Sequence, residues 1–315
     1  MRGIGIFSGS AHRELATEIC SLLDLPLHHA EVHRFSNDCL QTQLQSNCRE
    51  QDVFLIQPLV PPVQEHLMEL LLMLDTARGA SAARITAVIP HYAYARSDKK
   101  DAPRISIGGR LVADLISTAG ADRVLTMALH APQVHGFFSV PVDHLNALNV
   151  LAEHFRKQDL SNTIVVSPDL GNAKAATQFA RLLDLPVAAG SKRRLSDDRV
   201  VIDSIVGDVT GKNAIVLDDE IATGGSILEL LDRLTEHGVQ RVSVACTHGL
   251  FTGKAIERFR DCDVLESIVT TNTVPIPEEK RLPNMTVLSS APLLSRAINN
   301  IHNGASVSSL FVNTV

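Results

Sequence analysis

Two adjacent acids stand beside a glycine turn in the segment VLDDEIATGGS, residues 216–226. The acids are Asp218 and Asp219, and the turn residues that follow are Thr223, Gly224, Gly225 and Ser226. Glycines let the backbone approach a ligand closely, and the N–H groups at a helix N-terminus attract phosphate. Carboxylates repel phosphate, so the acids need a second kind of ligand group, and neighbouring hydroxyls fit them as hydrogen-bond donors. The segment therefore predicts a site for a sugar phosphate such as ribose 5-phosphate.

The elements around this segment predict where the site lies. The apolar run KNAIVLD (212–218) predicts a buried strand, and GSILELLDRLTEHG (225–238) predicts an amphipathic helix that ends at a glycine. In an open parallel sheet, ligands bind beyond the carboxyl ends of the strands. A simple loop with a helix cap is the alternative interpretation, but the strand, the acid pair and the glycine turn together favour a binding site.

A repeat with an offset of 160 residues runs through the chain. The pentapeptide LLDLP occurs at 22–26 and again at 182–186. Other positions match at the same offset, among them Ala16 and Thr17 with Ala176 and Thr177, and Glu69, Leu70 and Leu71 with Glu229, Leu230 and Leu231. A chance pentapeptide would not keep its register this far, so the repeat indicates two related domains.

Each half of the chain alternates short β-branched runs with amphipathic helical stretches, for example RITAVIP (84–90) and VQEHLMELLLMLDTARGA (63–80) in the first half. This alternation predicts an α/β fold of two tandem domains, each a mainly parallel sheet flanked by helices. We expect the first domain to span residues 1–145 and the second to span 146–303. Residues 304–315 are expected to form a tail that packs on the first domain.

The composition argues against several functional classes. The chain has 315 residues, of which 45% are hydrophobic and 20% charged, and its formal net charge of -6 makes nucleic acid a poor candidate partner. No apolar run is long enough for a membrane span, and no signal peptide is expected. Five scattered cysteines without a CxxC pair favour reduced thiols in a cytoplasm over disulfides or a zinc site.

The segment 216–226 resembles the ribose-diphosphate binding loop that phosphoribosyltransferases share with ribose-phosphate pyrophosphokinases. Other stretches resemble the pyrophosphokinases specifically, namely RFSND (34–38), PHYAYARSDKKD (90–101), LHAPQVHGFF (129–138) and VSPDLGNAK (166–174). The likeness covers nearly the whole chain. It implies two phosphoribosyltransferase-like domains, with the catalytic loop and the ribose-5-phosphate loop in the second. It also implies a transferase of nucleotide biosynthesis, ribose-phosphate diphosphokinase.

The implied reaction is attack by the anomeric hydroxyl of ribose 5-phosphate on the β-phosphorus of ATP, which gives 5-phosphoribosyl 1-diphosphate and AMP. Such a transfer depends on positioning and on neutralising charge over the phosphate oxygens. The stretch GSKRRLSDDR (190–199) resembles a mobile loop of the family, in which Lys192 and Arg194 match the catalytic pair. A solvated basic patch is the alternative interpretation of this stretch.

The resemblance also assigns the nucleotide side of the site. It implies Mg²⁺ as cofactor, with His130 and Asp169 helping to hold the metal–nucleotide group. The positions that match ATP-binding residues are Phe35, Asn37, Arg96, Asp98 and Lys99. Phe35 and Asn37 match residues that in the family embrace adenine from a neighbouring subunit. We therefore expect a homo-oligomer, with a hexamer favoured over a dimer or tetramer.

Some positions depart from the family pattern. Cys39 stands where the family usually has Glu, and Ser97 stands where it usually has Gln, both on the nucleotide side. A regulatory phosphate site is a further hypothesis. Its residues would be Arg49, Ser81, Ser306, Ser308 and Phe311, with departures at Asn47 and Ser309.

Two other functions remain open at this point. A nucleobase phosphoribosyltransferase would use the same loop, although the duplication and the Lys-x-Arg segment count against it. A non-catalytic, regulatory family member would assemble with active subunits. The change at Cys39 keeps that alternative open, whereas Lys192, Arg194, His130 and Asp169 favour catalysis.

Overall fold

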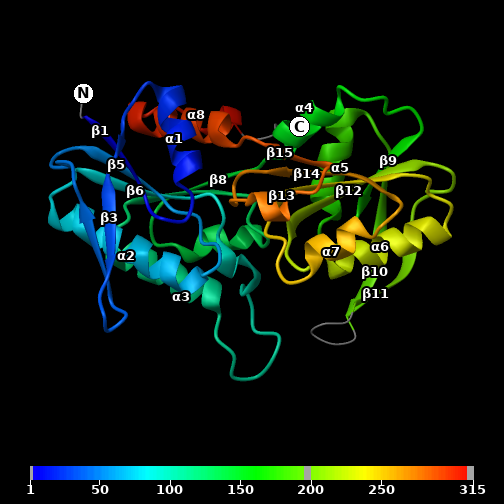
Figure 1. The fold of residues 1–315 in the computed structure, drawn as a ribbon, viewed down its shortest axis with the longest axis horizontal. Coiled ribbons are helices and arrows are strands. Elements are labelled where there is room, and N and C mark those ends of the chain that lie inside the picture. Colours follow the sequence, from blue (N-terminus) through cyan, green and yellow to red (C-terminus); the bar gives the residue numbers. More distant parts are fainter. Residues whose placement is uncertain (1–2, 195–199, 311–315) are drawn as a thin grey trace. The chain divides into compact units, whose positions relative to one another are not determined.

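The computed structural model describes residues 3–194 and 200–310, with only the backbone described at 192–194 and 200–203. The chain forms two compact units (Figure 1). The first unit runs up to Asn146 and also takes in Thr273–Pro275 and the described residues from Ser290 to Leu310. The second unit consists of Ala147–Asn272 and Ile276–Ser289.

The first unit is built on a parallel sheet of six strands in the order β2-β1-β5-β6-β7-β8. The strands are β1 (Ile4–Ser8), β2 (Leu27–His28), β5 (Asp52–Ile56), β6 (Arg84–Ile89), β7 (Arg123–Met127) and β8 (Val142–Leu145). A separate antiparallel hairpin is formed by β3 (Ala30–Arg34) and β4 (Leu40–Leu44). Strand β5 is buried along its whole length, as expected for a central strand covered on both faces.

Helices cover both faces of the first sheet (Figure 1). Helices α2 (Val63–Gly79) and α3 (Gly108–Ala119) lie on one face, and α1 (Arg13–Leu23) and α8 (Ala291–Asn303) lie on the other. Short 3-10 helices occur at η1 (Ala93–Arg96), η2 (Pro132–Phe137) and η4 (Ser308–Leu310). The core under α2 and α3 joins Phe7 and Leu55 of the sheet to Leu70 and Ile116 of the helices.

The second unit contains a seven-stranded sheet in the order β11-β10-β9-β12-β13-β14-β15, in which only the β10–β11 pair is antiparallel. The strands are β9 (Thr163–Ser167), β10 (Val187–Arg194), β11 (Val200–Val206), β12 (Asn213–Ile221), β13 (Val242–Gly249), β14 (Leu265–Thr271) and β15 (Met285–Leu288). The helices are α4 (Leu148–Phe155), α5 (Ala173–Leu183), α6 (Gly225–Glu236), α7 (Ala255–Arg260) and the 3-10 turn η3 (Glu278–Lys280).

The two faces of the second sheet carry separate cores because side chains alternate along each strand. On β12, Ile215 and Leu217 pack with α4 and α5, whereas Ala214 and Val216 pack with α6 and α7. A mainly parallel sheet flanked by helices therefore occurs in each unit, as the alternation of strand and helix patterns predicts.

The repeat seen in the sequence is present in the structure. Helices α1 and α5 are offset by 160 residues at both ends. Each helix ends at an aspartate in the left-handed conformation, Asp24 with φ 54° and Asp184 with φ 56°. Two units with the same helix and the same left-handed cap, each followed by a strand that starts at the same offset, are the expected product of a duplication.

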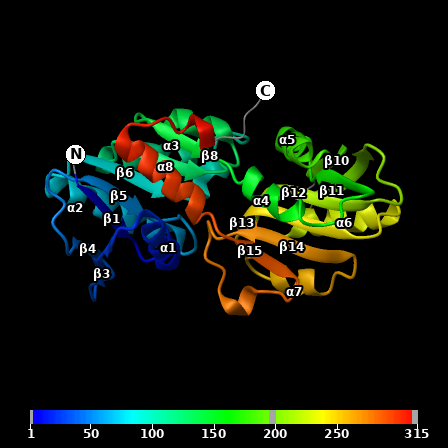
Figure 2. The same ribbon diagram turned by 90° about the horizontal axis from the view of Figure 1, so that it is seen from above.

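Helix α8 (Ala291–Asn303) belongs to a different unit from the one expected. The sequence placed residues up to 303 in the second domain, but α8 belongs to the first unit, where it packs beside α1 (Figure 2). The apolar face of α8, which includes Leu294 and Ile298, predicts burial but does not say against which sheet. The tail from Gly304 to Leu310 also belongs to the first unit.

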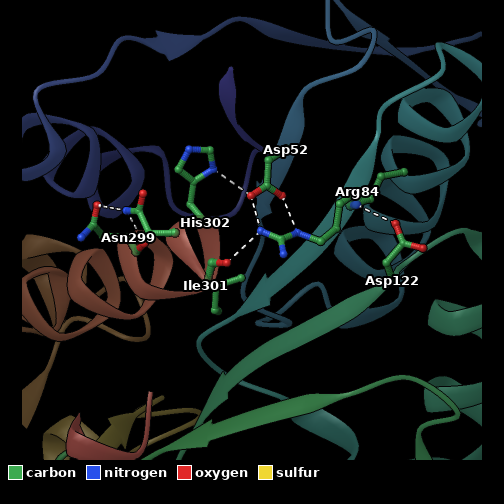
Figure 3. A network of polar contacts seen from close by, with 8 residues as sticks. Asp52, Arg84, Asp122, Asn299, Ile301 and His302 are labelled. Carbon is green, nitrogen blue, oxygen red and sulfur yellow. Dashed lines mark hydrogen bonds and ion pairs between the residues drawn. The ribbon is translucent and has the colours of Figure 1, made fainter. Parts of the chain in front are cut away.

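A polar network holds α8 on the first sheet (Figure 3). Arg84 Nε donates to Asp52 Oδ1 at 2.8 Å, and Arg84 also donates to Ile301 O of α8 at 2.9 Å. His302 Nδ1 lies 2.9 Å from Asp52 Oδ2, and Asp122 Oδ2 accepts from Ile85 N at 2.8 Å. Asp52 is buried, so its charge requires these partners. The network fixes the end of α8 to the amino ends of β5 and β6.

Across the described ranges, 3–194 and 200–310, no helix has the length and apolar character of a membrane span.

Candidate active site

The acid pair and the glycine turn lie at the carboxyl end of β12. The strand continues to Ile221, three residues beyond the expected end, and α6 begins at Gly225. Gly224 has φ 74°, and a Cβ atom at this position would lie 2.8 Å from the ring of Phe259. The turn therefore requires glycine for both its conformation and its close packing. Thr223 and Gly225 are exposed beside the helix N-terminus, where a phosphate could reach their N–H groups.

Asp218 and Asp219 are both partly buried. Asp218 Oδ1 accepts a hydrogen bond from Asp219 N at 2.9 Å. Burial, and next the charge of Asp219, raise the pKa of Asp218 well above its ordinary value. A second negative charge in this place is costly unless a ligand donates hydrogen bonds or brings a cation. The pair is thus prepared to accept hydrogen bonds from hydroxyl groups.

The raised pKa of Asp218 predicts that Asp218→Asn stabilises the unliganded chain. A carboxyl whose pKa is higher in the folded state contributes most to stability at low pH, and its contribution is lost as pH rises through that pKa. Asn keeps the oxygen that accepts from Asp219 N but carries no charge. Thermal unfolding without ligand should therefore show a higher Tm at pH 7 for Asp218→Asn than for wild type, and a smaller loss of Tm between pH 4 and pH 7.

Asp208→Asn is the matched control for this measurement. Asp208 is exposed, and a hydrogen bond from Lys212 lowers its pKa, so removing its charge should bring no gain in Tm. An Asp218→Asn variant that melts at or below the wild-type Tm at pH 7 would contradict the interpretation of the acid pair.

The loop after β9 carries Asp169, which is partly buried. Its main-chain oxygen accepts from Ser167 Oγ at 2.6 Å, and its Oδ1 accepts from Asn172 N at 3.0 Å. Asn172 Nδ2 in turn donates to Leu217 O, next to Asp218, at 2.9 Å. The structure thus brings Asp169 and the acid pair to one edge of the second sheet. Asn172 was not among the residues expected at the site, because an Asn at a helix start is ordinarily read as a cap.

The expected catalytic pair lies on the β10–β11 hairpin. The backbone of Lys192 pairs with Ile202 and that of Arg194 with Val200, and the register shifts between Ser191 and Lys192. The side chains of Lys192 and Arg194 lie outside the described residues. Strand β10 also pairs with β9, which precedes the Asp169 loop. The first strand of the hairpin, β10, therefore lies beside the strand that leads into the Asp169 loop.

His130 is exposed and follows β7 in the first unit. The turn before it contains Ala128 with φ 44°, and Leu129 N donates to His144 Nε2 at 2.8 Å. Burial, with a smaller effect of His135, lowers the pKa of His144 to about 4, so its Nε2 stays available as an acceptor. His144 thus stabilises the turn that carries His130. The sequence did not predict this role, because nothing in the strand pattern of β8 distinguishes His144.

The segment with Arg96, Asp98 and Lys99 begins at η1, and Arg96 and Lys99 are exposed. Asp98 Oδ2 accepts from Gln133 Nε2 at 2.6 Å, which joins this segment to the stretch that carries His130. Ser97 Oγ accepts from Gly108 N at 2.8 Å. The departure at Ser97 therefore has a local role, because its side chain satisfies a donor at the start of α3.

The hairpin of β3 and β4 carries Phe35, Asn37 and Cys39 at its tip. Phe35 is 45% exposed and packs edge-on against His33, with ring centroids 4.8 Å apart. Asn37 Oδ1 accepts from Cys39 N at 3.2 Å, and Cys39 is an exposed free thiol. The aromatic ring and the amide are therefore presented to solvent at the hairpin tip.

The proposed regulatory residues fall in the first unit. Arg49 N donates to Asn47 Oδ1 at 3.0 Å, and Glu50 N donates to Ser81 O at 2.9 Å, so these two loops meet. Ser308 N donates to Ser306 Oγ at 3.1 Å in the tail. Phe311 lies outside the described residues.

The described residues contain no cluster of three or more His, Cys, Asp or Glu side chains that could hold a metal. Mg²⁺ does not need such a cluster, because it keeps several waters and is commonly held by one or two carboxylates and substrate phosphates. Asp169 is a carboxylate of the required kind. The carboxylate of Asp169 therefore fits a Mg²⁺ ion that would arrive with a nucleotide.

Comparison with known proteins decides the family. A model described as the N-terminal domain of ribose phosphate pyrophosphokinase matches residues 4–120, and a phosphoribosyl synthetase-associated domain matches residues 199–312. A provisionally named ribose-phosphate pyrophosphokinase of Streptomyces coelicolor is 64% identical over 99% of this chain and 98% of its own length. The chain belongs to the ribose-phosphate pyrophosphokinase family. The ribose-phosphate pyrophosphokinase of Deinococcus radiodurans is 51% identical over 97% of both chains.

A solved structure supports the fold of this ribose-phosphate pyrophosphokinase family member. The phosphoribosylpyrophosphate synthetase of Mycobacterium smegmatis has a TM-score of 0.89 and 39% identity, and the match covers 96% of this chain and 100% of that chain. The prediction of an α/β fold with two phosphoribosyltransferase-like sheets is therefore confirmed.

Proposed function

We infer that this chain is an active ribose-phosphate diphosphokinase, which transfers the diphosphoryl group of ATP to the anomeric hydroxyl of ribose 5-phosphate. The observation that carries this inference is the acid pair and glycine turn at the carboxyl end of β12, with the Asp169 loop bonded to the same strand. Full-length relatives named ribose-phosphate pyrophosphokinase support it.

The proposed sugar-phosphate site uses two kinds of group. Asp218 and Asp219 accept hydrogen bonds from the sugar hydroxyls, while the turn at 223–226 donates its N–H groups to the 5-phosphate. The exposed Thr223 and Gly225 and the positive φ of Gly224 suit a close approach by phosphate. The raised pKa of Asp218 favours a ligand that offers donors to the pair.

In the described part of the first unit, the strand that corresponds to β12 is β5, and the loop after it lacks the acid pair and the glycine turn. The loop after β5, QPLVPP at 57–62, has neither acid nor glycine. Leu59 and Val60 are buried, and their carbonyl oxygens lie 2.8 Å from His91 Nδ1 and 2.7 Å from His66 Nδ1. We therefore assign one ribose 5-phosphate to each chain, bound at the second unit.

We assign catalysis of the diphosphoryl transfer to Lys192 and Arg194, which would neutralise negative charge on the phosphate oxygens. Lys192 provides a compact positive charge, and Arg194 provides a planar fork for two phosphate oxygens. Mg²⁺, when bound with ATP, lowers the negative charge over the diphosphoryl group. His130 and Asp169 are proposed to contact the metal–nucleotide group.

The nucleotide is assigned to residues of the first unit. Arg96, Asp98 and Lys99 are proposed to bind ATP, and Phe35 and Asn37 to contact adenine from a neighbouring subunit. Their place on an exposed hairpin tip is compatible with that arrangement. We propose a homo-oligomer, with a hexamer favoured, in the cytoplasm.

The inference is tested by AMP formation from ATP and Mg²⁺, with and without ribose 5-phosphate, at low and high phosphate, with a chelator as control. AMP that depends on both the sugar and Mg²⁺ is the expected result. A folded chain that binds ribose 5-phosphate but forms no AMP would instead be the non-catalytic family member. A change of rate across the phosphate series would support the regulatory site at Arg49, Ser81, Ser306 and Ser308, and a constant rate would reject it.

A further inference from the structure

Strand β12 extends beyond its neighbour β9 beside the acid pair. The two parallel strands stay in register up to Val216 opposite Val166. Strand β12 then continues to Ile221 next to β13. Its carboxyl end is therefore flanked by a strand on one side and by the loop after β9 on the other. This second side is where Asp169 lies.

The hydrogen-bond ladder between these strands stops at a proline. Asn213 donates its N–H to Asn162 O at 3.0 Å, so alternate residues of β12 up to Leu217 direct their peptide groups toward β9. The next N–H of that ladder would belong to residue 168, but Pro168 has no N–H. Leu217 is buried, and a buried carbonyl requires a donor.

Asn172 supplies the missing donor. Its side-chain Nδ2 lies 2.9 Å from Leu217 O, and this peptide leads directly into Asp218. The backbone N–H of the same residue donates to Asp169 Oδ1 at 3.0 Å. The loop between them is tight, since a Cβ atom at Gly171 would lie 3.1 Å from Asp169 Oδ1. One residue thus bonds to the Asp169 carboxylate through its backbone and to the strand of the acid pair through its side chain.

We propose that Asn172 is a positioning residue that fixes the separation between Asp169 and the acid pair Asp218–Asp219, and so aligns the nucleotide with the sugar. This assignment rests on the proposed diphosphokinase function. Asn172 touches neither substrate in this arrangement. It acts by holding the loop after β9 against the end of β12.

The expected effect of losing this link is on turnover rather than on binding. Each substrate keeps its own contacts when the loop shifts, because Asp169 and the acid pair remain in the chain. The reacting oxygen and phosphorus must still meet, and a misplacement of about 1 Å can cost on the order of 100-fold in rate. Asn172→Ala should therefore lower kcat about 10- to 100-fold and change the Kd of ribose 5-phosphate less than about threefold.

The chain offers a matched control at the opposite edge of the same sheet. Asn162 Nδ2 donates to Gly211 O at 2.8 Å, which is the same kind of side-chain bond to a neighbouring backbone. Asn162 has φ 60°, so Asn162→Gly removes its amide without backbone strain. Asn172 has φ -91°, which alanine adopts freely.

The experiment compares wild type, Asn172→Ala and Asn162→Gly by kcat, by ribose 5-phosphate titration calorimetry without ATP, and by Tm. A loss of turnover in Asn172→Ala alone, with sugar affinity retained, is the expected result. A kcat within twofold of that of Asn162→Gly overturns the proposal, and so does a loss of sugar affinity as large as the loss of kcat. An inactive wild type would reject the diphosphokinase function instead.

A second variant keeps the test decisive if Asn172→Ala does not fold. Asn172→Asp has the same size and suits a helix start, but its carboxylate cannot donate to Leu217 O. The expected result is again reduced kcat with ribose 5-phosphate affinity within about threefold of wild type. Wild-type turnover in Asn172→Asp overturns the proposal.

Discussion

Lys192→Ala is expected to lower turnover about 100- to 1,000-fold while leaving the affinity for ribose 5-phosphate nearly unchanged. The lysine would act on negative charge that develops over the phosphate oxygens during transfer, and such an interaction affects kcat more than ground-state binding. The side chain of Lys192 lies outside the described residues, so the assignment depends on its backbone position. Lys192 lies in β10, which pairs with β9 on one side and with β11 on the other.

The measurement is AMP release at saturating ATP and ribose 5-phosphate, with sugar binding followed separately by calorimetry. Lys157→Ala is the control, because Lys157 is exposed just after α4 and the charge change is the same. Lys192→Arg, which keeps the charge, should recover part of the rate. A Lys192→Ala enzyme with the wild-type rate would remove this residue from the mechanism.

Asp219→Asn is expected to weaken ribose 5-phosphate binding about 10- to 150-fold, which corresponds to the roughly 1.5–3 kcal/mol of a hydrogen bond to a charged group. Asn keeps one oxygen acceptor but loses the charge that strengthens a bond from a sugar hydroxyl. The effect on binding distinguishes Asp219 from Lys192, whose expected effect lies in turnover.

Calorimetric titration of ribose 5-phosphate in the absence of ATP measures this loss. Asp232→Asn provides the matched charge change, because Asp232 is an exposed residue of α6 in the same unit. If Asp219→Asn binds ribose 5-phosphate as tightly as wild type does, the acid pair does not bind the sugar hydroxyls as proposed.

The parts of the fold that could be predicted are those set by local sequence. The apolar runs that became β6 and β12 and the helical stretches that became α2 and α6 are recovered within a few residues. The internal repeat identified the two related units, because LLDLP ends a helix and turns the chain at both places. The glycine turn was also predicted from the sequence. The structure explains its glycine, because Gly224 has a positive φ and lies too close to Phe259 for a Cβ atom.

The parts that could not be predicted depend on contacts between distant segments. An amphipathic helix at 291–303 indicates a buried face, but not that the face packs in the first unit. The bond from Asn172 to Leu217 joins residues 45 apart, and the bond between Leu129 and His144 requires the pairing of β7 with β8. Neither leaves a pattern that a single sequence reveals.

The network that holds α8 also determines when the first unit can be completed during synthesis. Asp52 and His302, which it joins, are 250 residues apart, and the described residues of the second unit are made between them. At about 5–20 residues per second, the ribosome takes roughly 10–50 seconds to cover that distance. During this interval the apolar face that α8 later covers stays open and the Asp52 carboxylate lacks its histidine partner. A nascent chain of this protein therefore carries an unfinished first unit until α8 emerges, and a chain that stops before Ala291 would keep the first unit unfinished.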